Sequence, residues 1–291
     1  MHLNKLVLIL VCSVSLWGDW MIIDTTNSQK LTKDELIQRI GGNRNILLGE
    51  QHRNEEHHRL RGELIASFNP RNTVVVAEHL DIGKKVVWLH ELQADLEQGS
   101  FSTKGWKWPI HQSLFAPLKQ NGIELIGGNI TRENAKAVAM GGVDKLENTV
   151  AEILKATPYD AKEAEILAND IKVGHCNALP EGMLAPMSLA QQAKDSAMSL
   201  TLHRSQKPMR FLVAGNGHVR KDYGVPRILK SLYPEEKTLS IGFVEEEEFS
   251  RKNAKEYRDL YDVIVVAGNS PHEDHCAKFQ EQMQKKQLLK Q

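Results

Sequence analysis

Short runs of apolar and β-branched residues recur along the chain, and segments with helical spacing separate most of them. Within each run the apolar residues are continuous rather than alternating with polar ones. Such continuity is typical of strands that are buried on both faces of a parallel sheet. The runs predict strands at residues 21–23, 45–48, 73–77, 123–126, 211–214, 238–244 and 263–267.

Amphipathic patterns between these runs predict helices, among them 32–40, 55–68, 84–97 and 226–232. Strands that alternate with helices are typical of a mainly parallel sheet flanked by helices, so we predict an α/β fold. The acidic run at 245–248 is expected to form a solvated loop.

The alternation stops between residues 132 and 205, where successive segments have helical spacing and no strand pattern occurs. Asp and Thr lie near plausible starts of these helices. We interpret 132–205 as a small helical subdomain inserted between two strands of the sheet. The α/β domain then consists of 19–131 together with 206–291.

The first 18 residues have the pattern of a secretory leader. Lys5 precedes an apolar run that is too short to cross a bilayer as a helix. Cys12 is a candidate lipid-modified residue, although Val11 replaces the small residue usual before it; a cleavage site framed by Ser13 and Ser15 is the alternative. Both possibilities predict a protein of the cell envelope, either periplasmic or a lipoprotein anchored to a membrane through Cys12.

The charge balance bears on nucleic-acid binding, and the cysteine content bears on disulfide formation. Lys and Arg number 37, as do Asp and Glu, so the formal net charge is zero. A nucleic-acid-binding protein normally shows a basic excess or stripe, and we therefore exclude nucleic acid as a partner. Cys176 and Cys276 have no CxxC spacing. Pairing depends on a distance that sequence does not give, and we expect two unpaired thiols.

Carboxylates and imidazoles follow the ends of three predicted strands. Glu50 and His52 follow the second strand, Glu78 follows the third, and His218 follows the fifth within the segment GNGH. In open α/β sheets ligands bind at the carboxyl ends of the strands, so we expect these residues to share one site. Neither a Walker motif nor a GxSxG motif is present, which disfavours a P-loop nucleotide site and a serine hydrolase.

Three further histidines carry weaker signals. His57 and His58 lie on a predicted helix, where adjacent residues point to different faces, so at most one of them can face the site. We choose His57. His79, which directly follows Glu78, is expected to pack locally.

Tyr223 lies in the segment GHVRKDYGVP, a polar and glycine-bounded environment that is unusual for a core aromatic residue. Nearby Arg220 and Lys221 would stabilise an ionised phenol and so lower its pKa. A tyrosinate is a known axial ligand of haem iron. The alternative is an aromatic side chain of the loop that packs on the helix beginning at Pro226.

Five segments occur in the order LLGEQHRNEEHH, VVVAEHL, HCNALPEGM, QQAKDSAM and VAGNGHVRKDYGVPRIL. Together they resemble the ChaN family of haem-binding envelope lipoproteins linked to iron uptake. That family belongs to a superfamily with the TIKI proteins and the erythromycin-esterase-like proteins. The resemblance covers most of the chain after the leader.

The resemblance implies ferric haem bound at the interface of a homodimer, with two haems stacked face to face. A tyrosine would ligate the iron, and a histidine from the second copy would contact the propionates. Tyr223 lies in a matching motif, and Arg220 lies beside it. The candidates for the histidine are His218, His52 and His175, and the less motif-bound tyrosines are Tyr159, Tyr233, Tyr257 and Tyr261.

These observations lead to two functional hypotheses. We favour a binding protein, not an enzyme, that holds ferric haem through Tyr223 for storage or uptake, with an outer-membrane haem receptor as a candidate partner. The alternative is a metal-dependent hydrolase in which Glu50, His52, Glu78 and His218 bind a divalent metal or activate water. Glu50 and Glu78 would be its catalytic carboxylates.

Overall fold

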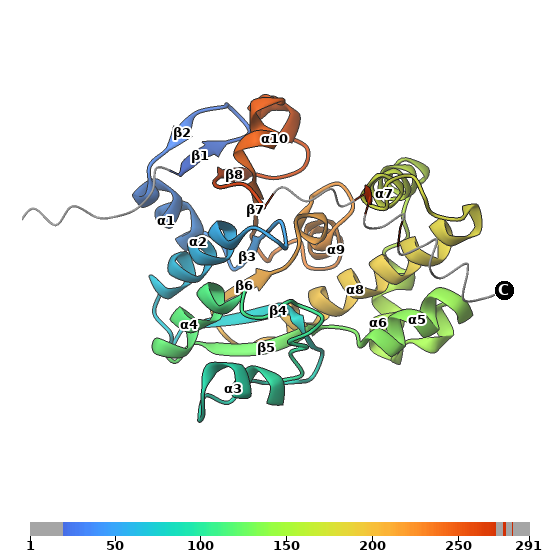
Figure 1. Cartoon of the computed structure of the whole chain (residues 1–291), viewed down its shortest axis with the longest axis horizontal. Helices are drawn as coiled ribbons and strands as arrows, with labels where there is room; N and C mark the ends of the chain where they lie inside the picture. The colour runs from blue at the N-terminus through green and yellow to red at the C-terminus, as the bar shows by residue number, and fades with distance from the viewer. Residues whose placement is uncertain (1–19, 272–275, 278–280, 282–291) are drawn as a thin grey trace, which may run out of the picture.

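A computed structural model describes residues 20–271, 276, 277 and 281 of the chain. Its centre is one sheet with the strand order β2-β1-β8-β7-β3-β6-β4-β5 (Figure 1). The strands are β1 (Met21–Asp24), β2 (Lys30–Leu31), β3 (Asn45–Leu48), β4 (Thr73–Asp81), β5 (Glu124–Asn129), β6 (Met209–Val213), β7 (Thr238–Val244) and β8 (Val263–Val266). Strands β3 to β8 pair in parallel, whereas β1 is antiparallel to β2 and β8.

The predicted α/β fold with a mainly parallel sheet is confirmed, and each predicted strand is present. The helices are α1 (Lys33–Gly41), α2 (Glu55–Ala66), α3 (Leu92–Gln98), α4 (Gln112–Gln120), α5 (Arg132–Gly141), α6 (Asn148–Ala156), α7 (Ala161–Gly174), α8 (Leu184–Arg204), α9 (Val225–Leu232) and α10 (Glu246–Ser250). Four 3₁₀ turns are η1 (Val143–Lys145), η2 (Glu181–Met183), η3 (Asn216–Val219) and η4 (Ala254–Tyr257). The leader at 1–18, with Cys12, lies outside the described residues.

Two local predictions are wrong. The helix expected at 84–97 begins only at Leu92, because Lys85 forms a β-bridge with Ile126 and the Asp95 side chain accepts hydrogen bonds from the backbone ahead of the helix. The acidic run at 245–248 enters α10 instead of a loop. In both places tertiary contacts override the local pattern.

The sheet is buried on both faces because alternate residues of each strand point to opposite sides. Ile46 and Leu48 pack beneath α1, α2 and α4, whereas Leu47 packs against the side that carries α8 and α9. Each continuous apolar run therefore contributes side chains to two hydrophobic cores, one on each face of the sheet.

Between β5 and β6 the described chain is helical throughout. Figure 1 shows α5, α6 and α7 gathered beyond α8, at the end of the molecule away from β1 and β2. Their own apolar cluster includes Val138 on α5, Val150 on α6 and Ala197 on α8. The exact domain boundaries at 131 and 206 stay a prediction.

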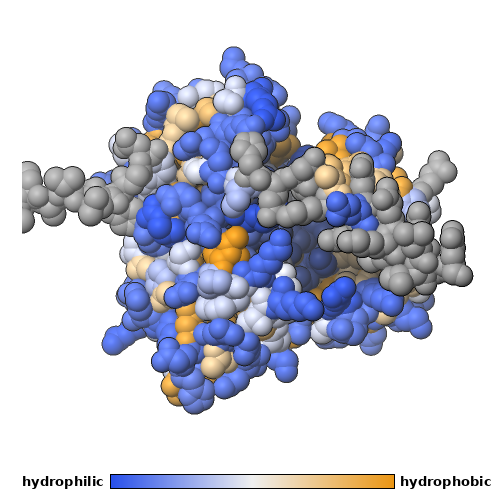
Figure 2. Space-filling view, in the orientation of Figure 1, coloured by the Kyte–Doolittle hydropathy of each residue, from blue (hydrophilic) through white to orange (hydrophobic). Residues whose placement is uncertain are grey.

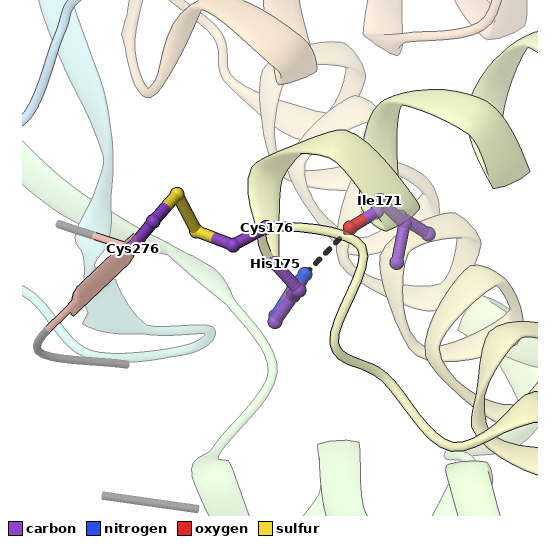
Figure 3. The surroundings of a disulfide bond; sticks show 4 residues. All are labelled: Ile171, His175, Cys176 and Cys276. Atoms are coloured by element: carbon purple, nitrogen blue, oxygen red, sulfur yellow. Dashed lines mark hydrogen bonds between the residues drawn. A yellow bond between two sulfur atoms is a disulfide. The ribbon is translucent and has the colours of Figure 1, made fainter. Parts of the chain in front are cut away.

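Cys176 and Cys276 form a disulfide, so the prediction of two unpaired thiols is wrong. Their Cα atoms are 5.4 Å apart, within the usual range for a disulfide, although the residues are 100 positions apart in sequence. Figure 3 shows the bond beside the end of α7, next to His175. Folding alone brings the two thiols together, which is why spacing in the sequence could not indicate the pair.

Among the described residues, no helix is both long and apolar enough to cross a bilayer. The face shown in Figure 2 is mostly hydrophilic, with small apolar areas.

Gly127 on β5 occupies a position with no room for a side chain. A Cβ atom there would lie 1.9 Å from the carbonyl oxygen of Asp81 on β4, where the pairing register of the two strands shifts. We expect Gly127→Ala to lower the free energy of unfolding by about 1–3 kcal/mol, because backbone must move to relieve the overlap. Urea unfolding measures this change.

The matched control is Gly41→Ala at the end of α1, where the added methyl group meets no atom within 4 Å. It should be neutral or slightly stabilising, since alanine is the better helix former. Equal effects of the two substitutions would contradict the account of Gly127.

Candidate functional site

A cavity lies at the carboxyl ends of β3 and β6, whose connections run toward opposite sides of the sheet. From β3 the chain passes through α2 to β4, and from β6 it passes through α9 to β7 on the other side of β3. A crevice forms at the carboxyl ends of two such strands, and this is where open α/β sheets bind ligands. The cavity has a volume of about 520 Å³ and is lined from the ends of β3, β4 and β6 and from α7 and α8.

Six of the seven predicted site residues line this cavity: Glu50, His52, Glu78, His218, Arg220 and Tyr223. The seventh, His175, is not among the described lining residues, although its neighbour Gly174 is. Its Nδ1 lies 2.7 Å from the carbonyl oxygen of Ile171 at the end of α7 (Figure 3). The rule that ligands bind beyond strand ends therefore predicted which side chains gather at this cavity, and their functional roles stay a prediction.

His218 lies between two buried carboxylates. Its Nδ1 is 2.5 Å from Asp195 Oδ1 on α8, and its Nε2 is 3.2 Å from Glu78 Oε1 at the end of β4. Burial alone would lower the pKa of His218, but the charges of Glu78 and Asp195 outweigh it and raise this pKa to about 10. At neutral pH His218 is therefore an imidazolium whose two N–H groups face carboxylates.

The surrounding backbone fixes this arrangement. The amide of Gly215 donates a hydrogen bond to Glu78 Oε2 at 2.8 Å, which joins the ends of β4 and β6. Asp195 was missed by the sequence analysis. A signal existed, because Gln191, Lys194 and Asp195 have the i, i+3, i+4 spacing of one helix face.

Glu50 is buried behind His52 and holds it in place. Glu50 Oε1 lies 2.6 Å from His52 Nδ1, and the His52 side chain remains 47% exposed. The other oxygen, Oε2, contacts the fully buried guanidinium of Arg61 and lies 3.0 Å from His58 Nδ1. Glu50 thus connects the cavity to a buried polar cluster beneath it.

The choice of His57 over His58 is wrong. His57 accepts a hydrogen bond from the Gln51 amide at 3.1 Å and its Nε2 lies 2.9 Å from the Ala267 carbonyl oxygen, so it braces the loops. Adjacent residues of a helix point to different faces, so His58 contacts Glu50 instead.

The assignment of His79 to local packing is incomplete. Its ring packs on Trp106, with the ring centroids 4.4 Å apart, yet its Nε2 is also 3.5 Å from Glu50 Oε1. His111, from the chain before α4, approaches the same oxygen at 3.7 Å. No pattern in the sequence marked His111, since it follows no strand and belongs to no motif.

Tyr223 lies on the wall of the cavity and is almost fully buried. Its hydroxyl donates to Asp170 Oδ2 on α7 at 2.9 Å, and the Arg220 guanidinium lies 4.5 Å from the centre of its ring. Burial raises the pKa of Tyr223, and Arg220 offsets this only in part. The predicted lowering of this pKa is wrong, partly because Lys221 pairs with Asp262, 3.0 Å away, rather than with the phenol.

Comparison with known proteins assigns the chain to a family. A family model described as haem-binding uptake, Tiki superfamily, ChaN matches residues 36–229. The chain belongs to this family. No curated protein matches it.

Two solved structures are similar to this ChaN-family chain. One, described as cofacial heme binding to ChaN of Campylobacter jejuni, has 19% identity and a TM-score of 0.69, covering 86% of this chain and 98% of that chain. The other, a mutant of erythromycin esterase in its open conformation, has 12% identity and a TM-score of 0.46, covering 89% of this chain and 100% of that chain. The first shares the fold described above.

The cavity of this ChaN-family chain fits the cofactor that the family binds. Gly217 and Tyr223 both line it, and a Cβ atom on Gly217 would lie 3.4 Å from the Tyr223 hydroxyl oxygen, so this oxygen faces the glycine across the cavity wall. Tyr257 and Tyr261 add two further rings to the wall. Lys194 also lines the cavity and has no hydrogen-bond or ion-pair partner among the described residues, which leaves a cation for an acidic ligand group.

Proposed function

We propose that the cavity holds ferric haem for storage or hand-over, with Tyr223 as the axial ligand of the iron. The observation that carries this proposal is the Tyr223 hydroxyl on the cavity wall of a chain from a haem-binding family. When bound, ferric haem supplies an iron centre with an axial position that a phenolate can fill.

The residues around Tyr223 act on its ionisation in opposite directions. The phenol must lose its proton to ligate iron, and burial opposes that loss. Asp170 Oδ2 accepts the hydrogen bond from the hydroxyl and also raises the pKa of Tyr223, so the iron would have to displace this proton. Arg220 lies over the ring and stabilises the resulting negative charge. Lys194 is the cation that we assign to a propionate.

The same proposal includes the assembly and location of the protein. Two copies would pair with their haems face to face; the cofacial heme binding described for ChaN of Campylobacter jejuni supports the stacking of the haems. Disulfides persist in oxidising compartments, so the Cys176–Cys276 bond supports export by the leader and a place in the cell envelope. Anchoring through lipidated Cys12 and delivery to an outer-membrane haem receptor belong to the same proposal.

Haem titration of the chain without residues 1–18 tests the function. We expect saturable binding with a tyrosinate-type visible spectrum and a rise in molecular mass to that of a dimer. Tyr223→Phe should lose that spectrum and weaken binding at least tenfold, which corresponds to about 1.4 kcal/mol or more. Tyr233→Phe is the matched control, since Tyr233 stacks on His203 and does not line the cavity.

Each outcome of the titration has a meaning. A tyrosinate spectrum that persists in Tyr223→Phe would move the ligand to Tyr257 or Tyr261, the other phenols on the wall. Absence of saturable binding to the unmodified chain would overturn the proposed function.

Hydrolysis is a second candidate function, supported by the Glu50–His52 pair. Glu50 orients the half-exposed His52, as a carboxylate orients a catalytic base. The metal-dependent form has less support, because both ring nitrogens of His218 already lie against the carboxylates of Asp195 and Glu78. A screen of ester substrates with the unmodified chain and His52→Gln tests the metal-free form.

A further inference from the structure

A second cluster of chemically active groups lies beneath the haem cavity, and its histidines take no part in the proposed haem binding. It consists of His58 on α2, His79 on β4 and His111 at the start of α4, grouped around Glu50. Each of these side chains is at most 3% exposed. Imidazoles at this depth require partners.

Two of these imidazoles lack such partners. Both ring nitrogens of His79 and both of His111 are buried without a hydrogen bond within the described part of the chain. Buried polar atoms are nearly always satisfied in native proteins, and an exception calls for a bound water or ion. The atoms lie close to a carboxylate, which makes an ion the more specific explanation.

The distances fit coordination of a small cation. Glu50 Oε1 lies 3.5 Å from His79 Nε2 and 3.7 Å from His111 Nε2. Ligand atoms of Glu50, His58 and His111 also lie within 4.8 Å of one another. A tetrahedral metal with bonds of about 2.0–2.1 Å holds its ligand atoms about 3.3 Å apart, close to the two distances from Glu50 Oε1.

We propose that Glu50, His79 and His111, with His58 beside them, bind a divalent transition-metal ion of the zinc or cobalt type. Imidazole nitrogen with one carboxylate is a donor set that these ions prefer. The ring nitrogens of His79 and His111 make no hydrogen bond among the described residues, so each ring can turn a nitrogen to a metal.

Arg61 has two opposing effects on this site. Its guanidinium contacts the second oxygen of Glu50 and lies 3.0 Å from His58 Nδ1, so it orients the carboxylate as an outer partner of the metal. Its positive charge also repels a dication, so we expect moderate affinity rather than the very tight binding of an all-imidazole or thiolate site.

The ion has two routes of entry. Glu50 lines the 520 Å³ cavity, whereas His79 and Trp106 line a second cavity of about 320 Å³. The cluster therefore lies in the wall between two cavities. It is separate from Tyr223, which lines only the first of them.

Cobalt titration of the haem-free chain, followed by visible absorption and calorimetry, tests the proposal. We expect one Co²⁺ per chain with the intense bands of a four-coordinate site, and a rise in melting temperature. His111→Gln and His79→Gln should each weaken binding at least tenfold. His90→Gln is the matched control, since His90 is exposed, and it should bind as the unmodified chain does.

Three results would overturn the site. The first is that the unmodified chain binds no stoichiometric Co²⁺. The second is that its bound Co²⁺ gives the spectrum of a six-coordinate hydrated ion. The third is that binding is lost only when His272 and His275, which lie outside the described residues, are both replaced. The spectrum of the unmodified chain decides the question even when a variant does not fold. Haem titration of His111→Gln, which should give the unmodified spectrum, distinguishes failure of this site from failure of the haem proposal.

Discussion

Replacing Asp195 with Leu is expected to lower the free energy of unfolding by about 3–5 kcal/mol at pH 7. Asp195 is fully buried, and its Oδ1 lies 2.5 Å from His218 Nδ1. Without it the His218 imidazolium keeps a single carboxylate partner, Glu78, 3.2 Å away. Urea unfolding of the haem-free chain measures the loss.

Asp259→Leu is the matched control for this substitution, because Asp259 is exposed. It should change stability by no more than about 0.5 kcal/mol. A similarly small effect of Asp195→Leu would mean that His218 is neutral in the folded protein and that the buried ion pairs do not form.

The same residues make stability depend on pH. Folding raises the pKa of His218 from its usual 6.5 to about 10, so its contribution is complete below pH 6.5 and is lost as the pH rises through 10. Folding lowers the pKa of Glu78 from its usual 4.5: burial opposes ionisation, but the His218 charge outweighs it, and this contribution is lost as the pH falls below 4.5. Unfolding free energies measured from pH 6 to 10 should decline in the unmodified chain and decline less in His218→Gln.

Reducing the Cys176–Cys276 disulfide should cost about 2–5 kcal/mol of stability, the second large effect that we expect. The bond joins residues 100 positions apart, so in the unfolded chain it restricts a long loop that includes α8 and the last three strands. Thermal unfolding with and without a reductant measures the difference.

Cysteine variants provide the control for that measurement. Cys176→Ser, Cys276→Ser and the double substitution should all melt at the temperature of the reduced chain, and a reductant should not lower the melting temperature of the double variant further. If the oxidised and reduced forms of the unmodified chain melt together, the bond does not contribute to stability.

The sequence determined the architecture because the signals for it are local. An apolar run such as 45–48 fits a strand buried on both faces, and β3 forms there with all four residues buried. Parallel strands also bring their carboxyl ends to one edge, which placed Glu50, Glu78 and His218 together without any coordinates. The five motifs pointed to the family that the matched region 36–229 establishes.

Only the tertiary structure decided which groups touch and what charge they carry. Asp195 meets His218 across 23 positions, and Cys176 meets Cys276 across 100. A side chain's pKa depends on its burial and on charges within a few ångströms, and neither can be derived from spacing along a chain. For that reason the sequence could name Tyr223 and His218 as candidate site residues, whereas the raised pKa of both and the imidazoles gathered beneath Glu50 required the fold.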